Sequence, residues 1–265
     1  MGINCGNLIL LKAFADASGG DAPLGDLVMY GRLHVTLAAA EQVRITRHLK
    51  LSADALARRE SEPALQNIGT RSIRSIDVSD YEGCDIVFDL TQDLATHPEL
   101  ASKLCETFDT VLDYGTSEHV FNVAQSLVNA WNLLREGGRY IFDLPVPGWA
   151  SHGLYQFTPD FFHSVGRSAH FHLAQIMFHE KRGDRVFSIA EFDRSAWRRL
   201  TGRRKISAWG VLEKRRPDGM AGPLRATDLR VMQSDIRLAP SSGHKNRVFS
   251  AATIGPAMRA LLVKP

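Results

Sequence analysis

The region that decides the fold contains two stretches, FDTVLDYGTSEHV at residues 108–120 and LLREGGRYIF at residues 133–142. The first stretch begins with a short, mostly apolar run at residues 108–115, which is typical of a buried strand. Residues 118–135 carry apolar side chains at helical spacing, and the Gly-Gly pair that follows is a suitable helix end. Residues 139–146 are apolar again. The region therefore predicts a strand, an amphipathic helix and a second strand.

The chain before residue 108 continues this alternation. Short apolar runs predict strands at residues 27–31, 71–79 and 85–90. Composition and break residues predict helices at 8–17, 38–49, 54–65 and 98–108. Strands that alternate with helices favour a parallel sheet covered by helices on both faces.

The pattern changes after residue 150, where apolar runs follow one another with polar turns between them. Residues 171–178, 186–192 and 206–213 are predicted to be strands, and this succession is typical of antiparallel hairpins. A last helix is predicted at residues 254–262. We therefore expect an α/β fold whose parallel sheet is finished by antiparallel strands.

The chain is predicted to have three parts. Residues 1–24 form an N-terminal helical segment that ends at a Ser-Gly-Gly-Asp-Ala-Pro break, and residues 25–150 form the α/β core. Residues 151–265 form an antiparallel extension that completes the sheet and the substrate side.

Composition places the chain among ordinary globular proteins. It has 265 residues, of which 44% are hydrophobic and 23% charged, and this excludes disordered, collagen-like and coiled-coil classes. No apolar run is long enough to span a membrane and no basic leader begins the chain, so we expect a soluble, cytoplasmic protein with no membrane partner. Three widely spaced cysteines without a CxxC pair suggest neither disulfides nor zinc.

Positive charge is concentrated in one segment. Residues 181–216 contain twelve basic and four acidic residues, although the formal net charge of the whole chain is only +3. Such a segment can bind phosphates, but few aromatic residues are interleaved with it. We expect solvated hairpins there, and nucleic acid is an unlikely partner.

The candidate site follows from the fold class. In an open parallel sheet, ligands bind outside the carboxyl ends of the strands. The predicted strand ends carry Gly31, Asp77 and Asp89, and residues 113–119 follow the fourth strand. Acidic side chains at such ends suit a ligand with hydroxyl groups or amines.

The order of features in residues 108–146 resembles the second half of class I S-adenosylmethionine-dependent methyltransferases. In that family the fourth strand commonly leads to a Glu-His pair, which Glu118 and His119 match, and a Leu-Leu-x-x-Gly-Gly turn precedes the fifth strand. The resemblance covers about residues 25–147. It implies a Rossmann-like methyltransferase fold with a mostly parallel sheet, helices on both faces and antiparallel C-terminal strands. It also implies S-adenosylmethionine as cofactor.

The resemblance assigns cofactor-binding roles by position. Asp77 is the nearest match to the carboxylate that holds the ribose, and Asp89 resembles the acidic residue beside the adenine. Gly31, Tyr114 and Gly115 are then expected to line the cofactor.

The first glycine loop departs from the family pattern. In LVMYGRLHV (27–35), Met29 stands where the family has an acidic residue, and Leu33 replaces the second glycine. Leu33 adds bulk where backbone should approach the cofactor, and Arg32 brings positive charge near a sulfonium unless a carboxylate pairs with it.

Candidate catalytic and substrate-binding residues follow the fourth and fifth strands. Glu118, His119 and Tyr155 are the candidate catalytic residues, with His119 or Tyr155 assisting deprotonation of the acceptor. His152 and Gln156 are predicted to bind substrate, from a loop that could equally be purely structural. No HExxH spacing is present, so no metal site is predicted.

The expected function is S-adenosylmethionine-dependent methyl transfer to an oxygen or nitrogen of a small molecule or sugar. One alternative is a catalytically inactive, methyltransferase-like binding or scaffold module, which the altered glycine loop favours. A second is an RNA-directed methyltransferase that uses the basic segment, residues 181–216.

Overall fold

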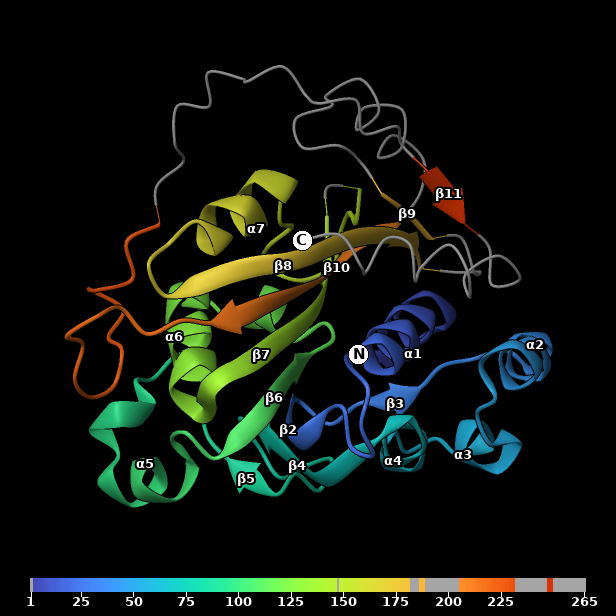
Figure 1. Cartoon of the computed structure of the whole chain (residues 1–265), viewed down its shortest axis with the longest axis horizontal. Helices are drawn as coiled ribbons and strands as arrows, with labels where there is room; N and C mark the ends of the chain where they lie inside the picture. The colour runs from blue at the N-terminus through green and yellow to red at the C-terminus, as the bar shows by residue number, and fades with distance from the viewer. Residues whose placement is uncertain (1, 147, 182–185, 189–204, 232–246, 250–265) are drawn as a thin grey trace.

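The structure, a computed structural model, describes residues 2–146, 148–181, 186–188, 205–231 and 247–249. Its centre is a twisted sheet, with helices on both sides (Figure 1). Nine described strands form it, in the order β11 (Arg247–Phe249), β9 (Val186–Ser188), β8 (Phe171–Glu180), β10 (Ile206–Lys214), β7 (Leu134–Pro145), β6 (Phe108–Asp113), β2 (Gly25–Tyr30), β4 (Thr70–Asp77) and β5 (Ile86–Val87).

Strand direction divides the sheet in two. Strands β5, β4, β2, β6 and β7 are parallel, whereas β10, β8, β9 and β11 each pair antiparallel with their neighbours. The predicted fold class is confirmed: it is a Rossmann-like α/β sheet, mostly parallel in its first part and finished by antiparallel strands. A separate pair of short parallel strands joins β1 (Gly2–Ile3) to β3 (His34–Val35).

Helices cover both faces of the sheet through two separate apolar clusters. One face packs against α5 (Pro98–Leu104), α6 (Val123–Leu133) and α7 (Pro159–Gly166). The other packs against α1 (Cys5–Ser18), α2 (Ala39–Leu49), α3 (Ala53–Ala57) and α4 (Glu62–Ile68).

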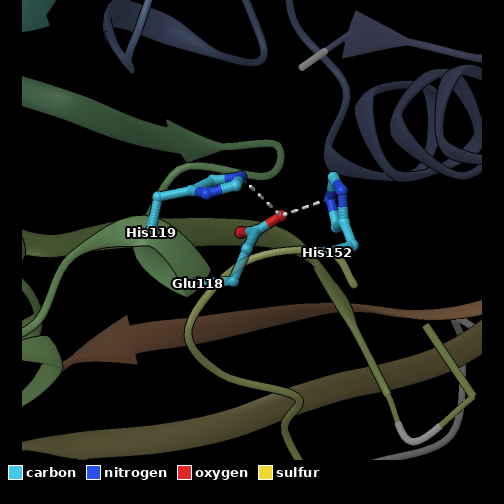
Figure 2. A group of neighbouring side chains, drawn as sticks. All are labelled: Glu118, His119 and His152. Carbon is cyan, nitrogen blue, oxygen red and sulfur yellow. Dashed lines mark ion pairs between the residues drawn. The ribbon is translucent and has the colours of Figure 1, made fainter. Parts of the chain in front are cut away.

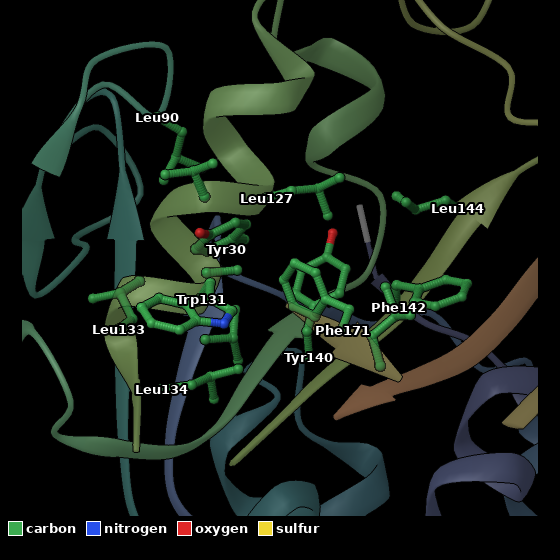
Figure 3. Packing of buried hydrophobic residues seen from close by; sticks show 14 of the residues in the cluster. Tyr30, Leu90, Leu127, Trp131, Leu133, Leu134, Tyr140, Phe142, Leu144 and Phe171 are labelled. Atoms are coloured by element: carbon green, nitrogen blue, oxygen red, sulfur yellow. The ribbon is translucent and has the colours of Figure 1, made fainter. Parts of the chain in front are cut away.

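Alternation along each strand divides its side chains between the two clusters. In β2, Val28 and Tyr30 join the α6 side, whereas Leu27 and Met29 join the α1 side. Figure 3 shows the α6 side, where Tyr30 and other aromatic and leucine side chains gather between the helix and the strands. Burial on both faces explains why the parallel strands are nearly continuous apolar runs.

The strand order locates the edge of the sheet at which a ligand is expected to bind, called the ligand edge below. The chain starts the parallel sheet at β2, builds β4 and β5 on one side, and then crosses to build β6 and β7 on the other. The order therefore reverses between β2 and β6. In open α/β sheets, ligands bind at such a reversal, outside the carboxyl ends of the strands.

A buried polar cluster fixes α1 to the sheet. His179 Nε2 lies 2.8 Å from Asp143 Oδ1, and Asn7 Nδ2 donates to Asp143 Oδ2 at 2.7 Å. Burial opposes protonation of His179, but the charge and hydrogen bond of Asp143 together with the Glu180 carbonyl outweigh it, so the pKa of His179 is raised. The packing is close, because a Cβ on Gly6 would lie 2.3 Å from His179 Nδ1.

Several element boundaries differ from the sequence predictions. The helix predicted at residues 118–135 is a 3₁₀ turn, η2 (Ser117–His119), followed by α6, because Asn122 caps α6 through the amide of Gln125. The glycine pair lies within β7 and does not end the helix; Gly137 has φ of 71° where the pairing with β6 is irregular.

Two further predictions were wrong in detail. The helix predicted at residues 54–65 is two short helices, α3 and α4, because the backbone between them pairs with the segment that contains Val35. The strand predicted at residues 85–90 is only the two-residue β5. Helix α7 was not predicted, and the helix predicted at residues 254–262 lies outside the described residues.

Candidate active site

One buried carboxylate, at the end of β6, fixes the loop that follows this strand through hydrogen bonds to the loop backbone. Asp113 Oδ1 accepts hydrogen bonds from the backbone amides of Thr116 (2.9 Å) and Ser117 (3.3 Å). Tyr140 donates its hydroxyl to Asp113 Oδ2 at 2.5 Å. Burial raises the pKa of Asp113, which these hydrogen bonds oppose. The tightened turn brings Glu118 and His119 over the sheet edge.

The loop after β7 is joined to the first loop through backbone. The carbonyl oxygen of Glu118 accepts from the amides of Leu154 (2.7 Å) and Tyr155 (3.1 Å). Gly153, which directly precedes Leu154, has φ of 70°, and a Cβ there would lie 2.8 Å from Glu118 Cγ. Glycine is therefore needed at residue 153, and the close approach places His152 beside Glu118.

These contacts assemble Glu118, His119 and His152 into one cluster (Figure 2). Glu118 Oε1 lies 3.4 Å from His152 Nε2 and 4.0 Å from His119 Nε2. The Glu118 side chain is only 2% exposed, whereas those of His119 and His152 are 46% and 34% exposed. The cluster therefore consists of a buried carboxyl group and two partly exposed imidazole rings.

Burial favours the uncharged form of all three side chains. Burial, with a further contribution from Asp113, raises the pKa of Glu118 to about 8. Burial lowers the pKa of His119, and burial together with the neighbouring His119 lowers that of His152. An unprotonated imidazole with a free nitrogen can accept a proton or bind a metal ion.

Two other predicted site residues make structural contacts. Gln156 Oε1 accepts from the amides of Gly148 and Trp149, and its Nε2 donates to the Trp149 carbonyl. The amide of Gln156 thus closes its own loop. Tyr155 donates its hydroxyl to the Phe121 carbonyl at 2.7 Å, a contact that ties the two loops together at the surface.

On the β2 and β4 side, three predicted cofactor residues lie at the ligand edge. Gly31 follows β2 with φ of 69°, and Gly115 follows β6 with φ of 92°. Asp77 is the last residue of β4, and no described residue hydrogen-bonds its carboxylate. Two glycines in the left-handed region and a free carboxylate thus stand at the carboxyl ends of β2, β6 and β4.

The departures in the first glycine loop are accommodated within the protein. Leu33 is fully buried in the α1-side cluster, so its bulk points into the core. Arg32 pairs with Glu62 at 3.0 Å and donates to the carbonyls of Glu82 and Gly83. The positive charge is therefore neutralised by a carboxylate of α4.

The last two predicted cofactor residues have partners of their own. Asp89 Oδ1 accepts from the amide and the hydroxyl of Thr91, and these bonds lower the pKa of Asp89. Tyr114 is buried in the α1-side cluster, where its hydroxyl accepts from Trp209 Nε1 at 2.8 Å. Only the backbone of Tyr114 is left to face a ligand.

Most of the basic segment, residues 181–216, lies outside the described residues. Of its described members, Lys214 is buried against the Trp131 ring and pairs with Glu106 at 3.0 Å. Arg216 pairs with Glu106 and Glu136. These two cations therefore have structural partners.

In the part of the chain that the structure describes, no helix is both long and apolar enough to cross a bilayer.

Of the two residues that support the cluster, the sequence indicated the local hydrogen bonding of Asp113 but not the role of Gly153. Asp113 stands in an Asp-Tyr-Gly turn, whose composition is a usable signal for a carboxylate that hydrogen-bonds nearby amides. Gly153 carried no signal of its own, because only the approach of Glu118 excludes a side chain there.

No family model and no curated protein matches the sequence. Solved structures do resemble the fold. 1,6-Didemethyltoxoflavin-N1-methyltransferase of Burkholderia thailandensis, solved with S-adenosylhomocysteine, is 16% identical over 79% of each chain with a TM-score of 0.41.

Two further structures give similar values. A putative methyltransferase of Bacillus halodurans is 13% identical over 78% of this chain and 99% of its own, with a TM-score of 0.40. A complex of the Haloferax volcanii Trm112 activator with a putative methyltransferase gives 13% identity, coverage of 81% and 92%, and a TM-score of 0.44. Similarity at this level does not identify what the present chain binds.

Proposed function

We propose that the chain is an S-adenosylmethionine-dependent methyltransferase that acts on an oxygen or nitrogen of a small molecule or sugar. The observation that carries the proposal is the Glu118, His119 and His152 cluster at the point where the strand order reverses. A ligand-binding edge and proton-accepting groups coincide there. The resemblance of residues 108–146 to class I methyltransferases supports the same function.

The ligand edge fits the proposed cofactor. The unpartnered carboxylate of Asp77 can accept hydrogen bonds from ribose hydroxyls at the end of β4. Gly31 and Gly115 put no side chain where a nucleoside would pass, and Gly115 is partly exposed there whereas Gly31 is buried. Asp89 lies beyond β5, on the side proposed for the adenine. The cofactor supplies an electrophilic methyl group; the protein supplies position and a proton acceptor.

His119 is the proposed proton acceptor. Burial lowers the pKa of its imidazole, so the ring is unprotonated near neutral pH and can take a proton from an acceptor hydroxyl or amine. His152 lies beside it, with the ring centroids 5.3 Å apart, and can orient the same acceptor. Tyr155 positions this loop through its bond to the Phe121 carbonyl.

The rim of the cluster favours an acceptor with an apolar face. Phe121 is 76% exposed and Leu154 is 61% exposed, and both belong to the two loops that carry the histidines. A ligand that covers large, solvent-exposed apolar side chains removes apolar surface from water, which favours binding. We infer a small acceptor that presents a ring or hydrocarbon beside its hydroxyl or amine.

Calorimetry with S-adenosylmethionine and S-adenosylhomocysteine tests the proposal. We expect micromolar binding that Asp77→Ala weakens at least tenfold. Asp54→Ala, which removes an exposed carboxylate in the first turn of α3, is the matched control and should bind as the unchanged chain does. Absence of binding at millimolar ligand would refute the proposed methyltransferase activity. It would favour the scaffold alternative, in which the altered loop, with its Arg32–Glu62 ion pair, no longer binds the cofactor.

A further inference from the structure

The carboxylate of Glu118 is buried without a full set of partners. Its side chain is 2% exposed, and its Oε2 atom has no hydrogen-bond partner among the described residues. Burying a charged or polar group without partners is costly. A proton on the carboxyl or a cation bound to this oxygen removes that cost.

Two imidazole nitrogens point toward the same place. Figure 2 shows the rings of His119 and His152 on opposite sides of the Glu118 carboxylate, each joined to it by one contact. One ligand atom from each residue can be chosen so that all three lie within 4.8 Å of one another. No other described residue hydrogen-bonds either ring, so their lone pairs are free.

We propose that Glu118, His119 and His152 form a binding site for a first-row divalent metal ion, with zinc as the best-suited member of that group. This site goes beyond the proposed methyl transfer and does not depend on it: with the ion bound, His119 is a metal ligand, and with the ion absent it is the free proton acceptor proposed above.

The distances suit such an ion. Zinc binds histidine nitrogen at about 2.0–2.1 Å and carboxylate oxygen at about 2.0–2.2 Å, so in a tetrahedral site two ligand atoms lie roughly 3.4 Å apart. The contact of Glu118 Oε1 with His152 Nε2, at 3.4 Å, matches this separation, and the one with His119 Nε2, at 4.0 Å, must shorten by about 0.6 Å. The ligand atoms of the cluster lie within 4.8 Å of one another, so the two imidazoles must approach each other by at most about 1.4 Å, and the side chain of His119 is 46% exposed.

The donor set selects the ion. Two imidazoles and one carboxylate suit zinc, iron, cobalt or nickel, whereas magnesium and calcium prefer oxygen ligands in larger number. The exposed side of the two rings leaves coordination positions open to water or to an oxygen of a ligand. The arrangement is therefore that of an open site.

The surrounding charges are mixed, with the negative ones behind the cluster. Asp113 and Asp143 act on Glu118 from β6 and β7, and both favour a cation there. Lys181 and Lys205 lie over the Trp149 ring, which contacts the His152 ring, and their charges oppose a cation there.

Zinc and cobalt titrations of the chelator-treated, untagged full-length chain test the site. We expect one ion per chain by calorimetry, and a cobalt absorption spectrum with visible ligand-field bands but no thiolate charge-transfer band. Magnesium should produce neither signal. Since no cofactor is added, this result is independent of whether the chain binds S-adenosylmethionine.

Single substitutions locate the site. Glu118→Gln, His119→Ala and His152→Ala should each lower zinc affinity by more than about tenfold, because even outer-shell partners contribute 10- to 100-fold. His48→Ala, which removes an exposed histidine in the last turn of α2, should leave it unchanged. Glu118→Gln keeps the shape of the side chain, and circular dichroism of each variant checks that it folds. Zinc affinity that survives all three substitutions in folded protein, or no binding below millimolar zinc, would overturn the proposal.

Discussion

Glu118 should make the stability of this protein fall as pH rises, and Glu118→Gln should remove most of that fall. The carboxyl has a pKa of about 8 in the folded chain against an ordinary value of 4.5, chiefly because it is buried. Above pH 4.5 the group ionises in the unfolded chain, which stabilises the unfolded state, whereas the folded chain keeps the proton until about pH 8. Glutamine is neutral in both states, so it lacks this loss.

The size of the effect follows from the difference between the two pKa values. Each unit corresponds to about 1.4 kcal/mol, so the difference amounts to about 5 kcal/mol once the folded group is ionised. Most of that develops between pH 5 and pH 8, where we expect the variant to gain about 3.5 kcal/mol of stability relative to the unchanged protein. For comparison, a typical domain has only about 5–15 kcal/mol of stability in total.

Urea unfolding at pH 5, 6, 7 and 8 with a chelator present measures this difference. His119 and His152 are present in both proteins, so the comparison between them reports on Glu118. Glu99→Gln removes an exposed glutamate in the first turn of α5, and its stability should run parallel to that of the unchanged chain. If the gain from Glu118→Gln is the same at pH 5 and pH 8, within about 0.5 kcal/mol, the carboxyl is not held neutral by burial and the reasoning is refuted.

Three further substitutions test the construction of the site. Gly153→Ala should destabilise the chain by about 1–3 kcal/mol and lower turnover, because φ of 70° disfavours alanine and its Cβ would meet Glu118; thermal unfolding and activity measure both. Asn7→Ala should cost about 1–3 kcal/mol by leaving Asp143 Oδ2 short of a donor, and amide exchange in α1 should speed up. Tyr155→Phe should cost about 0.5–1.5 kcal/mol by urea unfolding without changing the metal affinity, since it removes only the bond to the Phe121 carbonyl.

The parallel sheet was predictable because its signal is local. Apolar strands such as residues 27–31 and 108–115 correspond to β2 and β6, since a strand buried on both faces must be apolar along its whole length. Helix ends were less predictable. The apolar periodicity continues through residue 134, but pairing with Phe108 draws Leu134 into β7, and this depends on a strand distant in the sequence.

Candidate residues were predictable in position but not in partnership. The strand-end rule selected Glu118 and His119, and the loop after the fifth strand contributed His152. Nothing in the sequence joins these loops, because the joining bonds are made by the backbone of Glu118, Leu154 and Tyr155. The same limit applies to Gln156, whose amide is used within its own loop.

The sequence by itself determined the α/β class, the order of the parallel strands along the chain and the edge at which a ligand would bind. These depend on apolar periodicity and on a topological rule, both of which act over short distances along the chain. Tertiary structure alone decided that Glu118 loses its solvent, that Leu33 turns into the core, and that His152 comes within 3.4 Å of Glu118. Burial and contact are properties of segments brought together from different parts of the chain, and it is burial that sets the charge of Glu118.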